Sequence, residues 1–453
     1  MRTKTGMNAA SRPPCSSPRL SRREFLYWTA LAAAGSGLTG CAVNPVTGES
    51  QLMLLSREQE IRIDREKAPH QLSADYGVVQ DEGLKGYVNA TGQRLAGLSH
   101  RPEMPYGFRP VNAVYVNAYA FPGGSIAVTR GILLEMDNEA QLAALLGHEL
   151  GHVTARHTAQ QMSRSMLTSL VISGLGAGLS IADKGRYAGL VTGLGGIGAG
   201  ALLAHYSRDH ERQADALGMD YMTKAGYSPE GMVGLMDILR QKSQREPSAL
   251  ETMFSTHPMS SERYATARER ARSQYGSARG NPVFKERYLD RTAGLRTIAP
   301  AIRRMQDGEK LMAQQKLEAA EAAFREALTI APDDYAGLVL RSKCLLAQKR
   351  HAEAEKVLAR AKEVYPQEAQ AHHFAGVNHI LRNDFDAAAH SFARYERLLP
   401  GNPVTDFLHG LAFEGMGRRQ NAAEKYVAFL NQVNQGEQAQ YAYTRLKQWG
   451  FVR

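Results

Sequence analysis

The sequence predicts a mainly α-helical chain of the α+β class, in which a domain with a small β-sheet precedes a solenoid of helical repeats. Three observations support this fold class. The last third repeats every 34 residues, which is a period of helical repeat arrays. Apolar residues recur at helical spacing around positions 139–153. Two short runs rich in β-branched residues flank Pro122-Gly123-Gly124, a turn-like sequence.

Residues 1–40 have the pattern of an export signal. Six basic residues precede an apolar stretch from Phe25 to Leu38, which is shorter than the ~20 residues that span a bilayer. Residues 21–26 (Ser-Arg-Arg-Glu-Phe-Leu) resemble the twin-arginine motif, with an ordinary basic leader as the alternative. Residues 38–41 (Leu-Thr-Gly-Cys) resemble a lipobox, which predicts lipidation of Cys41, with a chance cysteine at a cleavage site as the alternative.

Charge and cysteine content limit the partners. Cleavage before Cys41 would remove six basic residues and one acidic residue, so the formal charge of +10 would fall to +5. Nothing else resembles a nucleic-acid-binding module, so we expect no DNA or RNA partner. With Cys15 in the leader and Cys41 lipidated, Cys344 would remain alone and no intramolecular disulfide could form. Cys344 lies in an apolar helical run, which indicates packing.

The segment after Cys41 predicts a turn at 44–48, a charged helix over 56–68, and two strands, Val111 to Tyr119 and Ser125 to Thr129. The strands flank the turn at 122–124 and would form a hairpin.

His148-Glu149-Leu150-Gly151-His152 is the most informative motif. Asn138 and Gln141 have the spacing of a capping box, which predicts a helix through the motif. Residues four apart share a helix face, so His148 and His152 can reach one metal ion while Glu149 lies beside them. Two imidazoles, a third ligand and a carboxylate that accepts a proton from water suit zinc-dependent hydrolysis. The alternative is a surface helix that carries two histidines by chance.

A third ligand would strengthen this hypothesis. If the helix continued, His157 would lie about 140° round from His152 and point away from the metal. Glu211 and Asp215 are better candidates because they are four residues apart on a predicted helix. One carboxylate could bind zinc while the other orients a ligating imidazole. The alternative is a solvated charged face. The other downstream candidates are His205 and His210.

Two apolar stretches rich in glycine and alanine follow, Met166 to Ile181 and Tyr187 to Leu203. Each is short for a membrane span and broken by glycine, which argues against a true span. We favour a hairpin that touches the membrane, or a lid over the cleft, which is what the family resemblance given below implies for soluble members. Ser228-Pro229 then predicts another helix start.

The C-terminal third is predicted to contain tetratricopeptide repeats from about 301 to 435, followed by a closing helix. Such arrays form a curved surface whose concave side binds peptides or proteins, and the alternative is a structural cap on the first domain. Positions that recur every 34 residues are Pro332, Pro366 and Pro400; Ala320, Ala354, Ala388 and Ala422; Phe324, Leu358, Phe392 and Tyr426; and Gly308, Gly376 and Gly410, with Ser342 in the remaining place.

Four ordered motifs carry a family resemblance. They are His-Glu-x-x-His-Val-x-x-Arg-His at 148–157, Ser-Arg-x-x-Glu-x-x-Ala-Asp at 207–215, and the segments 117–124 and 254–258. Together they resemble the zinc metallopeptidase family of HtpX and the CAAX prenyl proteases, especially its periplasmic, BepA-like members with C-terminal repeats. The resemblance implies a gluzincin-type domain with one zinc ion per chain. Its implied site residues are His148, His152 and Glu211 as ligands, Glu149 as general base, and Asp215 as the carboxylate that orients a ligand.

The resemblance also implies roles outside the helices. The edge of the sheet would border the zinc cleft, so an extended substrate could pair with Asn117, Ala118 and Ala120 as an added strand. The alternative is a hairpin that only supports the catalytic helix. His257 would approach the zinc and hold the enzyme latent, or would be a turn histidine without a catalytic role. Arg263 would face a developing oxyanion, or would pair with an acid.

We therefore expect a zinc endopeptidase of the bacterial cell envelope that degrades misfolded or stalled envelope proteins. It would be lipid-anchored in the periplasm, at the outer rather than the inner membrane because Ala42 follows Cys41. The repeats could contact the outer-membrane assembly machinery. The alternatives are a chaperone or assembly factor with little proteolysis, and an integral membrane protease. The expected division is signal 1–40, peptidase domain 41–265, linker 266–300 and repeat domain 301–453.

Overall fold

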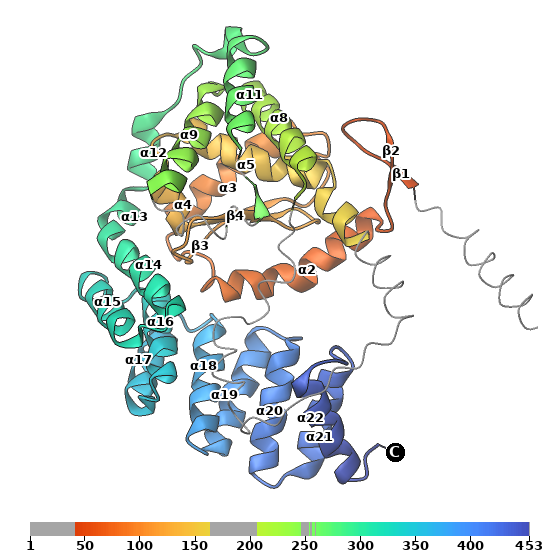
Figure 1. Cartoon of the computed structure of the whole chain (residues 1–453), viewed down its shortest axis with the longest axis vertical. Coiled ribbons are helices and arrows are strands. Elements are labelled where there is room, and N and C mark those ends of the chain that lie inside the picture. Colours follow the sequence, from red (N-terminus) through yellow and green to blue (C-terminus); the bar gives the residue numbers. More distant parts are fainter. Residues whose placement is uncertain (1–40, 164–205, 246–252, 254–255, 259, 453) are drawn as a thin grey trace, which may run out of the picture.

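The structure, a computed structural model, describes residues 41–163, 206–245, 253, 256–258 and 260–452 (Figure 1). The predicted export signal and the apolar stretches between 166 and 204 lie outside this part of the chain, so they stay predictions. Within the described ranges, no helix combines the length and the hydropathy that crossing a membrane requires.

The first domain begins with a two-stranded antiparallel pair, β1 (Cys41–Val43) and β2 (Ser50–Leu52), around the predicted turn. The charged helix predicted over 56–68 is α2 (Arg57–Ala74), and α3 (Glu82–Ala96) follows it. Ser56 and Gln59 form a reciprocal capping box at the start of α2. Asp64 of α2 accepts hydrogen bonds from the backbone and side chain of Ser125, at 2.8 and 2.6 Å, so α2 supports the next strand pair.

The central sheet has three strands in the order β3-β5-β4, with bounds Gly107–Val111, Ser125–Thr129 and Ala118–Ala120. Strand β3 is parallel to β5, and β4 is antiparallel to it, which confirms the predicted hairpin. The prediction of one strand from Val111 to Tyr119 is wrong. Pairing with β5 ends at Val111, because the Asn112 side chain donates to the Tyr76 carbonyl 3.0 Å away and the chain turns there. Strand β4 is therefore a short edge strand.

Helix α5 (Glu139–Thr154) is the centre of the first domain, and all of its residues are buried. It contacts β4 and packs against α8 (Arg208–Lys224) and α9 (Glu230–Arg245), as Figure 1 shows. The predicted cap at Asn138 is present, since its side chain accepts from the Gln141 backbone. The Gln141 side chain accepts from the Asp137 backbone instead of closing the box.

Shorter helices connect these elements to the solenoid. Helix α4 (Arg130–Glu135) precedes α5, and α11 (Ser261–Arg272) packs on α8 and α9. The segment 266–300, expected as a linker, contains the end of α11 and the short helices η3 (Gly276–Ala278), α12 (Lys285–Arg291) and α13 (Ala293–Thr297). Buried Tyr288 donates a hydrogen bond to the Leu133 carbonyl at 2.6 Å, so this segment is folded against the first domain.

The C-terminal part is a solenoid of four helix pairs and a closing helix, which confirms the predicted repeats. A β-carbon on Gly308, Gly376 or Gly410 would lie 2.4–2.5 Å from the ring that repeats 16 positions later, so glycine allows each pair to close. The helices are α14 (Ala299–Ala313), α15 (Leu317–Ile330), α16 (Tyr335–Ala347), α17 (His351–Val364), α18 (Gln370–Leu381), α19 (Phe385–Leu398), α20 (Pro403–Gly415), α21 (Arg419–Leu430) and α22 (Glu437–Gln448).

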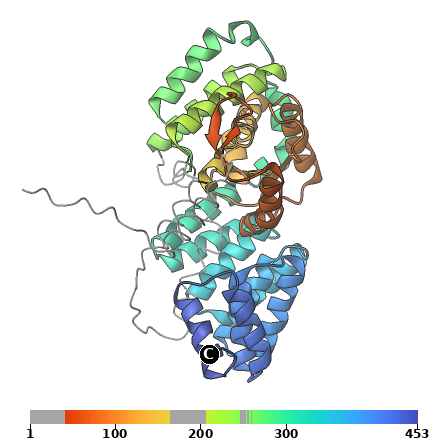
Figure 2. The same cartoon turned by 90° about the vertical axis from the view of Figure 1, so that its right-hand side faces the viewer.

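Buried polar contacts join the two parts, which lie one above the other in Figure 2. Arg130, at the start of α4, forms a bidentate ion pair with Asp334, at 2.6 and 3.1 Å, and both side chains are buried. Ser73 at the end of α2 donates to Glu368 of the solenoid. A bidentate ion pair fixes the orientation of its two partners, so this contact helps to set how the solenoid lies on the first domain.

Candidate metal centre

Close packing of α5 on α8 creates the site. A β-carbon on Gly218 would lie 2.8 Å from the backbone nitrogen of His148, and one on Gly151 would lie 3.0 Å from the Cα of Ala214. Glycine therefore lets the two helix backbones touch where the predicted ligands face each other. Ser207 caps α8 by accepting from the His210 backbone, so Glu211 lies in the first turn of the helix.

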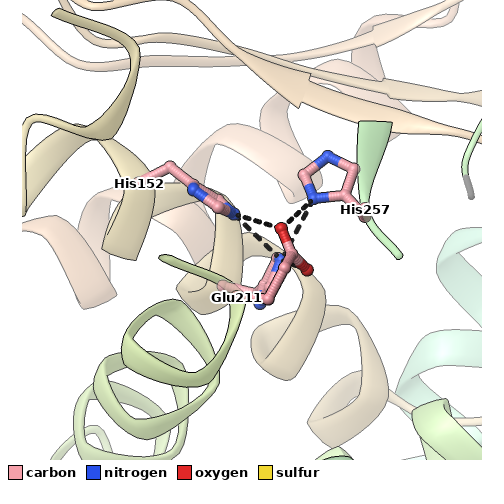
Figure 3. A group of neighbouring side chains, drawn as sticks. His152, Glu211 and His257 are labelled. Carbon is pink, nitrogen blue, oxygen red and sulfur yellow. Dashed lines mark hydrogen bonds and ion pairs between the residues drawn. The ribbon is translucent and has the colours of Figure 1, made fainter. Parts of the chain in front are cut away.

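Four side chains converge in this contact, and all are buried: His148, His152, Glu211 and His257. One ligand atom from each lies within 4.8 Å of the others. Figure 3 shows His152 and His257 pointing toward Glu211 from opposite sides. The Nε2 atoms of His148 and His152 are 3.1 Å apart, and they lie 3.6 and 3.4 Å from the Glu211 oxygens.

These distances fit a metal ion. Zinc ligands about 2.0–2.1 Å from a tetrahedral ion are separated by roughly 3.3 Å from one another. The distance between the two Nε2 atoms lies close to that value, as do the distances from His148 to Oε2 and from His152 to Oε1 of Glu211. Two imidazoles and one carboxylate are also a common donor set of catalytic zinc sites. The residues predicted as ligands therefore suit a metal, and the structure brings all three together.

His257 adds a fourth donor, as its predicted approach to the metal requires. Its Nδ1 atom lies 3.1 Å from Glu211 and 3.4 Å from Nε2 of His148, and its Nε2 atom lies 3.7 Å from Glu149. Burial alone would lower the pKa of His257, but the carboxylates of Glu149 and Glu211 raise it above its ordinary value. His257 therefore closes the side of the site that faces Glu149.

Asp215 and Arg263 support the ligands from behind. Nδ1 of His148 lies 2.9 Å from Asp215, the partner expected for a histidine whose Nε2 binds metal. Arg263 donates two hydrogen bonds of 2.7 Å to Asp215 and lies 2.6 Å from Glu211. Of the two roles considered for Arg263, the structure shows pairing with acids. Burial would raise the pKa of Asp215, but Arg263 and His148 hold it below its ordinary value.

Glu149 differs from the other carboxylates of the site. It is fully buried, and neither of its oxygens accepts a hydrogen bond from the described residues. Burial raises its pKa, although His257 and His148 oppose the shift. By contrast, burial would raise the pKa of Glu211, but His257, His152 and His148 hold it well below the ordinary range. The site thus contains one carboxylate with stabilised charge and one poised to take up a proton.

The predicted substrate strand is at the edge of the sheet. Ala118 and Ala120 belong to β4, whose only partner among the described strands is β5. Asn117 directly precedes β4 and is fully buried, yet neither atom of its side-chain amide has a hydrogen-bond partner within the described part of the chain. A buried amide gains stability from any partner outside these residues, whether another part of the chain, water or a ligand.

A small apolar cavity of about 20 Å³ borders His148, Asp215 and His257. It is too small for a side chain while His257 lies in its present position. Apolar side chains form most of its lining, namely Leu145, Met232, Leu235, Met236, Leu239 and Met253.

Sequence reasoning missed two neighbours of His152. Tyr206 stacks on its ring, with centroids 3.7 Å apart and planes at 21°, and no motif indicated this contact. His157 is not in the metal-ligating group, as predicted, but it lies directly behind His152 instead of pointing away. His210 is also outside the group and stacks on His157. His205 lies outside the described residues.

Comparisons with known proteins agree with this geometry. The sequence pattern of Peptidase family M48 matches residues 83–271, and that of the tetratricopeptide repeat matches residues 311–376. The chain is 31% identical to the beta-barrel assembly-enhancing protease of Yersinia pestis over 230 residues, 50% of this chain and 47% of the relative. It is 34% identical to Metalloprotease YcaL of Escherichia coli (strain K12) over 187 residues, 40% of this chain and 70% of the relative.

Among solved structures, the tetratricopeptide-repeat protein YrrB is similar with 17% sequence identity and a TM-score of 0.30, over 44% of this chain and 98% of that one. The chain spans about half the length of the beta-barrel assembly-enhancing proteases that it matches. The matched pattern contains the three converging donors and Glu149, which confirms the resemblance derived from the motifs. The chain therefore belongs to peptidase family M48 and carries a tetratricopeptide-repeat domain after the peptidase domain.

Proposed function

We propose that this chain is a zinc-dependent endopeptidase of the bacterial cell envelope that degrades misfolded or stalled envelope proteins. One observation carries the proposal: three donors converge at a spacing that suits zinc, and beside them lies a buried carboxylate, Glu149, that accepts no hydrogen bond from the residues that the structure describes. The names of the relatives, beta-barrel assembly-enhancing protease and metalloprotease, support the substrate class and the metal dependence.

The protein groups divide the chemistry of peptide hydrolysis among them. A zinc ion held by His148, His152 and Glu211 would polarise a water molecule and the substrate carbonyl. Glu149 accepts the proton of that water as its oxygen attacks the carbonyl carbon, and then donates the proton to the departing amine nitrogen. Burial raises the pKa of Glu149, which favours its uptake of the proton in the first of these steps.

The substrate would bind as an extended strand along β4. The outer edge of β4, which pairs with no other described strand, would offer main-chain hydrogen bonds, and the amide of Asn117 could donate one and accept one from the substrate backbone. Main-chain pairing requires little of the substrate sequence, which suits an enzyme for unfolded chains. The apolar cavity beside His148 would accept an aliphatic side chain next to the scissile bond once His257 has moved.

His257 would keep the enzyme latent. It approaches the three predicted ligands and Glu149, so it occupies the space that the reacting water and the carbonyl need. A His257→Ala variant is expected to cleave unfolded protein faster than wild type while binding the same amount of zinc. Slower cleavage at unchanged zinc content would instead make His257 part of the catalytic machinery.

If Cys41 is lipidated, we expect the protein to lie in the periplasm, anchored at the outer membrane. Its repeats would then face the outer-membrane assembly machinery. A Cys41→Ala variant is expected to lose a radiolabelled lipid and to leave the membrane fraction. Retention of the variant in carbonate-washed membranes would favour the integral-membrane alternative.

The activity itself is tested by digestion of an unfolded outer-membrane β-barrel protein. Cleavage is expected to stop in the presence of a chelator and to return on addition of zinc. Glu66→Gln, the same substitution at an exposed position on α2, is the control for a Glu149→Gln variant and should cleave like wild type. Cleavage that continues without metal would refute the proposal and leave the repeat domain, as a chaperone or assembly factor, as the main functional part.

A further inference from the structure

The two histidines of the metal-binding motif have different partners on the side away from the metal. Nδ1 of His148 faces a carboxylate, that of Asp215, at 2.9 Å. Nδ1 of His152 faces another imidazole nitrogen, Nδ1 of His157, at 3.0 Å. Two ring nitrogens at that distance share one proton, so one of them donates and the other accepts.

Counting protons fixes the direction of this hydrogen bond. A histidine that binds metal through Nε2 has its lone pair there and therefore carries its proton on Nδ1. His152 must then donate from Nδ1, and His157 must accept at Nδ1. A neutral His157 carries its own proton on Nε2, which lies 2.8 Å from the side-chain oxygen of Gln213. Both hydrogen bonds, from His152 to His157 and from His157 to Gln213, then have one donor and one acceptor.

The opposite arrangement is unfavourable. If His157 donated from Nδ1, His152 would carry its proton on Nε2. That proton would point into the ligand cluster, where Nε2 of His148 lies 3.1 Å away. His157 would also present a bare Nε2 atom to Gln213, 2.8 Å away, so the side-chain amide would have to turn over to donate.

The backbone and its neighbours fix the ring of His157 in place. Helix α5 ends at Thr154, and Arg156 has a φ of +60°, in the left-handed region. That strained turn is held by Glu60, whose carboxylate accepts from Arg156 at 2.9 Å, and by a 2.6 Å hydrogen bond from Arg156 to the Leu55 carbonyl. His157 is 2% exposed, and its ring stacks on that of His210, with centroids 4.2 Å apart.

We propose that His157 is a positioning residue for the metal ligand His152: it accepts the Nδ1 proton of His152, and thereby holds the ring and its tautomer so that Nε2 faces the metal. Gln213 completes the arrangement by accepting from His157. The inference rests on the proposed metal site but concerns affinity for the ion, not the identity of the substrate. It gives His152 a neutral acceptor where His148 has a charged one.

The test compares two substitutions of similar size. In His157→Asn, the side-chain oxygen can occupy the position of Nδ1 and accept the proton, whereas His157→Leu fills the space without an acceptor. Zinc affinity is measured on the purified full chain by competition with a chelator, and the absorption spectrum of the cobalt-substituted protein reports ligand geometry. Thermal unfolding of the metal-free proteins reports packing alone.

His157→Leu is expected to weaken zinc binding by about 10- to 100-fold, the usual effect of losing a partner behind a metal ligand. His157→Asn should retain affinity within about threefold of wild type, because the acceptor is kept. Wild-type affinity in the leucine variant would overturn the proposal, as would equal losses in both variants, which would reduce His157 to a packing residue. If the leucine variant does not fold, Gln213→Met replaces it, and unchanged affinity there would also overturn the proposal.

The test of the His157 variants and the test of the proposed function can fail independently of each other. If the wild-type chain binds no zinc and cleaves nothing, the enzyme proposal fails. If the wild-type chain binds zinc and cleaves, but the His157 variants bind it equally well, only the positioning role fails.

Discussion

Replacing Gly218 with alanine is expected to destabilise the metal site by forcing α5 and α8 apart. The added β-carbon would lie 2.8 Å from the backbone nitrogen of His148 and 3.0 Å from the carbonyl carbon of Gly147. Both are backbone atoms of a buried helix, so neither can move away as the end of a flexible side chain could. Restoring an ordinary contact requires a shift of about 0.6 Å between the helices. Metal sites tolerate ligand displacements of about 0.2 Å, so Glu211 would no longer meet both histidines.

The magnitude follows from a matched control on α3. Gly86 is exposed and helical, and a β-carbon there would meet nothing within 4 Å. Gly86→Ala should therefore stabilise the protein by up to about 1 kcal/mol through helix propensity. Gly218→Ala gains the same propensity but adds an overpacking cost of about 1–3 kcal/mol, so the two variants should differ by that amount.

The assay is chemical denaturation of both variants, combined with chelator competition for zinc. Gly218→Ala should also bind zinc about tenfold more weakly or worse, while Gly86→Ala binds it like wild type. Equal stabilisation by the two alanines, with unchanged zinc affinity, would refute the claim that this helix contact sets the geometry of the site.

Three further predictions concern the solenoid and its contact with the first domain. Asp334→Asn removes one charge of the buried ion pair between the two parts and should cost about 3–5 kcal/mol by chemical denaturation, whereas the exposed neighbour Asp333→Asn should leave stability nearly unchanged. Gly376→Ser should destabilise the solenoid by about 1–3 kcal/mol, because its β-carbon would lie 2.5 Å from the ring of Phe392. Adding Phe392→Leu should recover part of this loss, whereas losses that simply add would contradict the contact between the two residues. Burial raises the pKa of Glu309 from 4.5 to about 7, so between these values the native state keeps a proton that the unfolded state loses, and stability falls as pH rises. Glu309→Gln should flatten that fall in thermal unfolding between about pH 5 and 8, and a variant with the wild-type slope would contradict the assignment.

Local patterns predicted the parts of this protein that depend on short-range geometry. Helical spacing brought His148 and His152 to one face, and the same spacing brought Glu211 and Asp215 together on α8. The 34-residue period predicted the solenoid in its register. The structure also explains the one irregular repeat, since Ser342 stands where the others have glycine and its counterpart 16 positions later is Leu358, not an aromatic residue.

Long-range contacts could not be predicted from spacing. The direction predicted for the His157 side chain assumed that α5 continued. The helix instead ends at Thr154, because Arg156 adopts a left-handed conformation held by Glu60, 96 positions away. His157 lies outside the four-residue group that could hold a metal, but the geometry from which this was expected was wrong. The prediction of a single strand from Val111 to Tyr119 was also wrong because of a long-range contact, since the partner of the Asn112 side chain is the distant Tyr76 carbonyl.

The role of Arg263 also required the structure. Its position after the Thr-His-Pro sequence at 256–258 was compatible with a group that faces substrate or one that pairs with an acid. The three-dimensional contact decides this, because its guanidinium reaches both Asp215 and Glu211 at 2.6–2.7 Å. An arginine held in this way orients the ligands and balances their charge.

The central claim, metal-dependent hydrolysis with Glu149 as the base, is tested most directly by measuring zinc content and peptide-bond cleavage together in wild type and Glu149→Gln. Glu149 lies beside the ligands but outside the metal-ligating group, so the variant should still bind one zinc ion per chain. Its cleavage of an unfolded β-barrel protein should fall by about 10²- to 10⁴-fold, the usual contribution of a general base. Cleavage at the wild-type rate by the zinc-loaded variant, or a wild-type protein that cleaves without metal, would contradict the account.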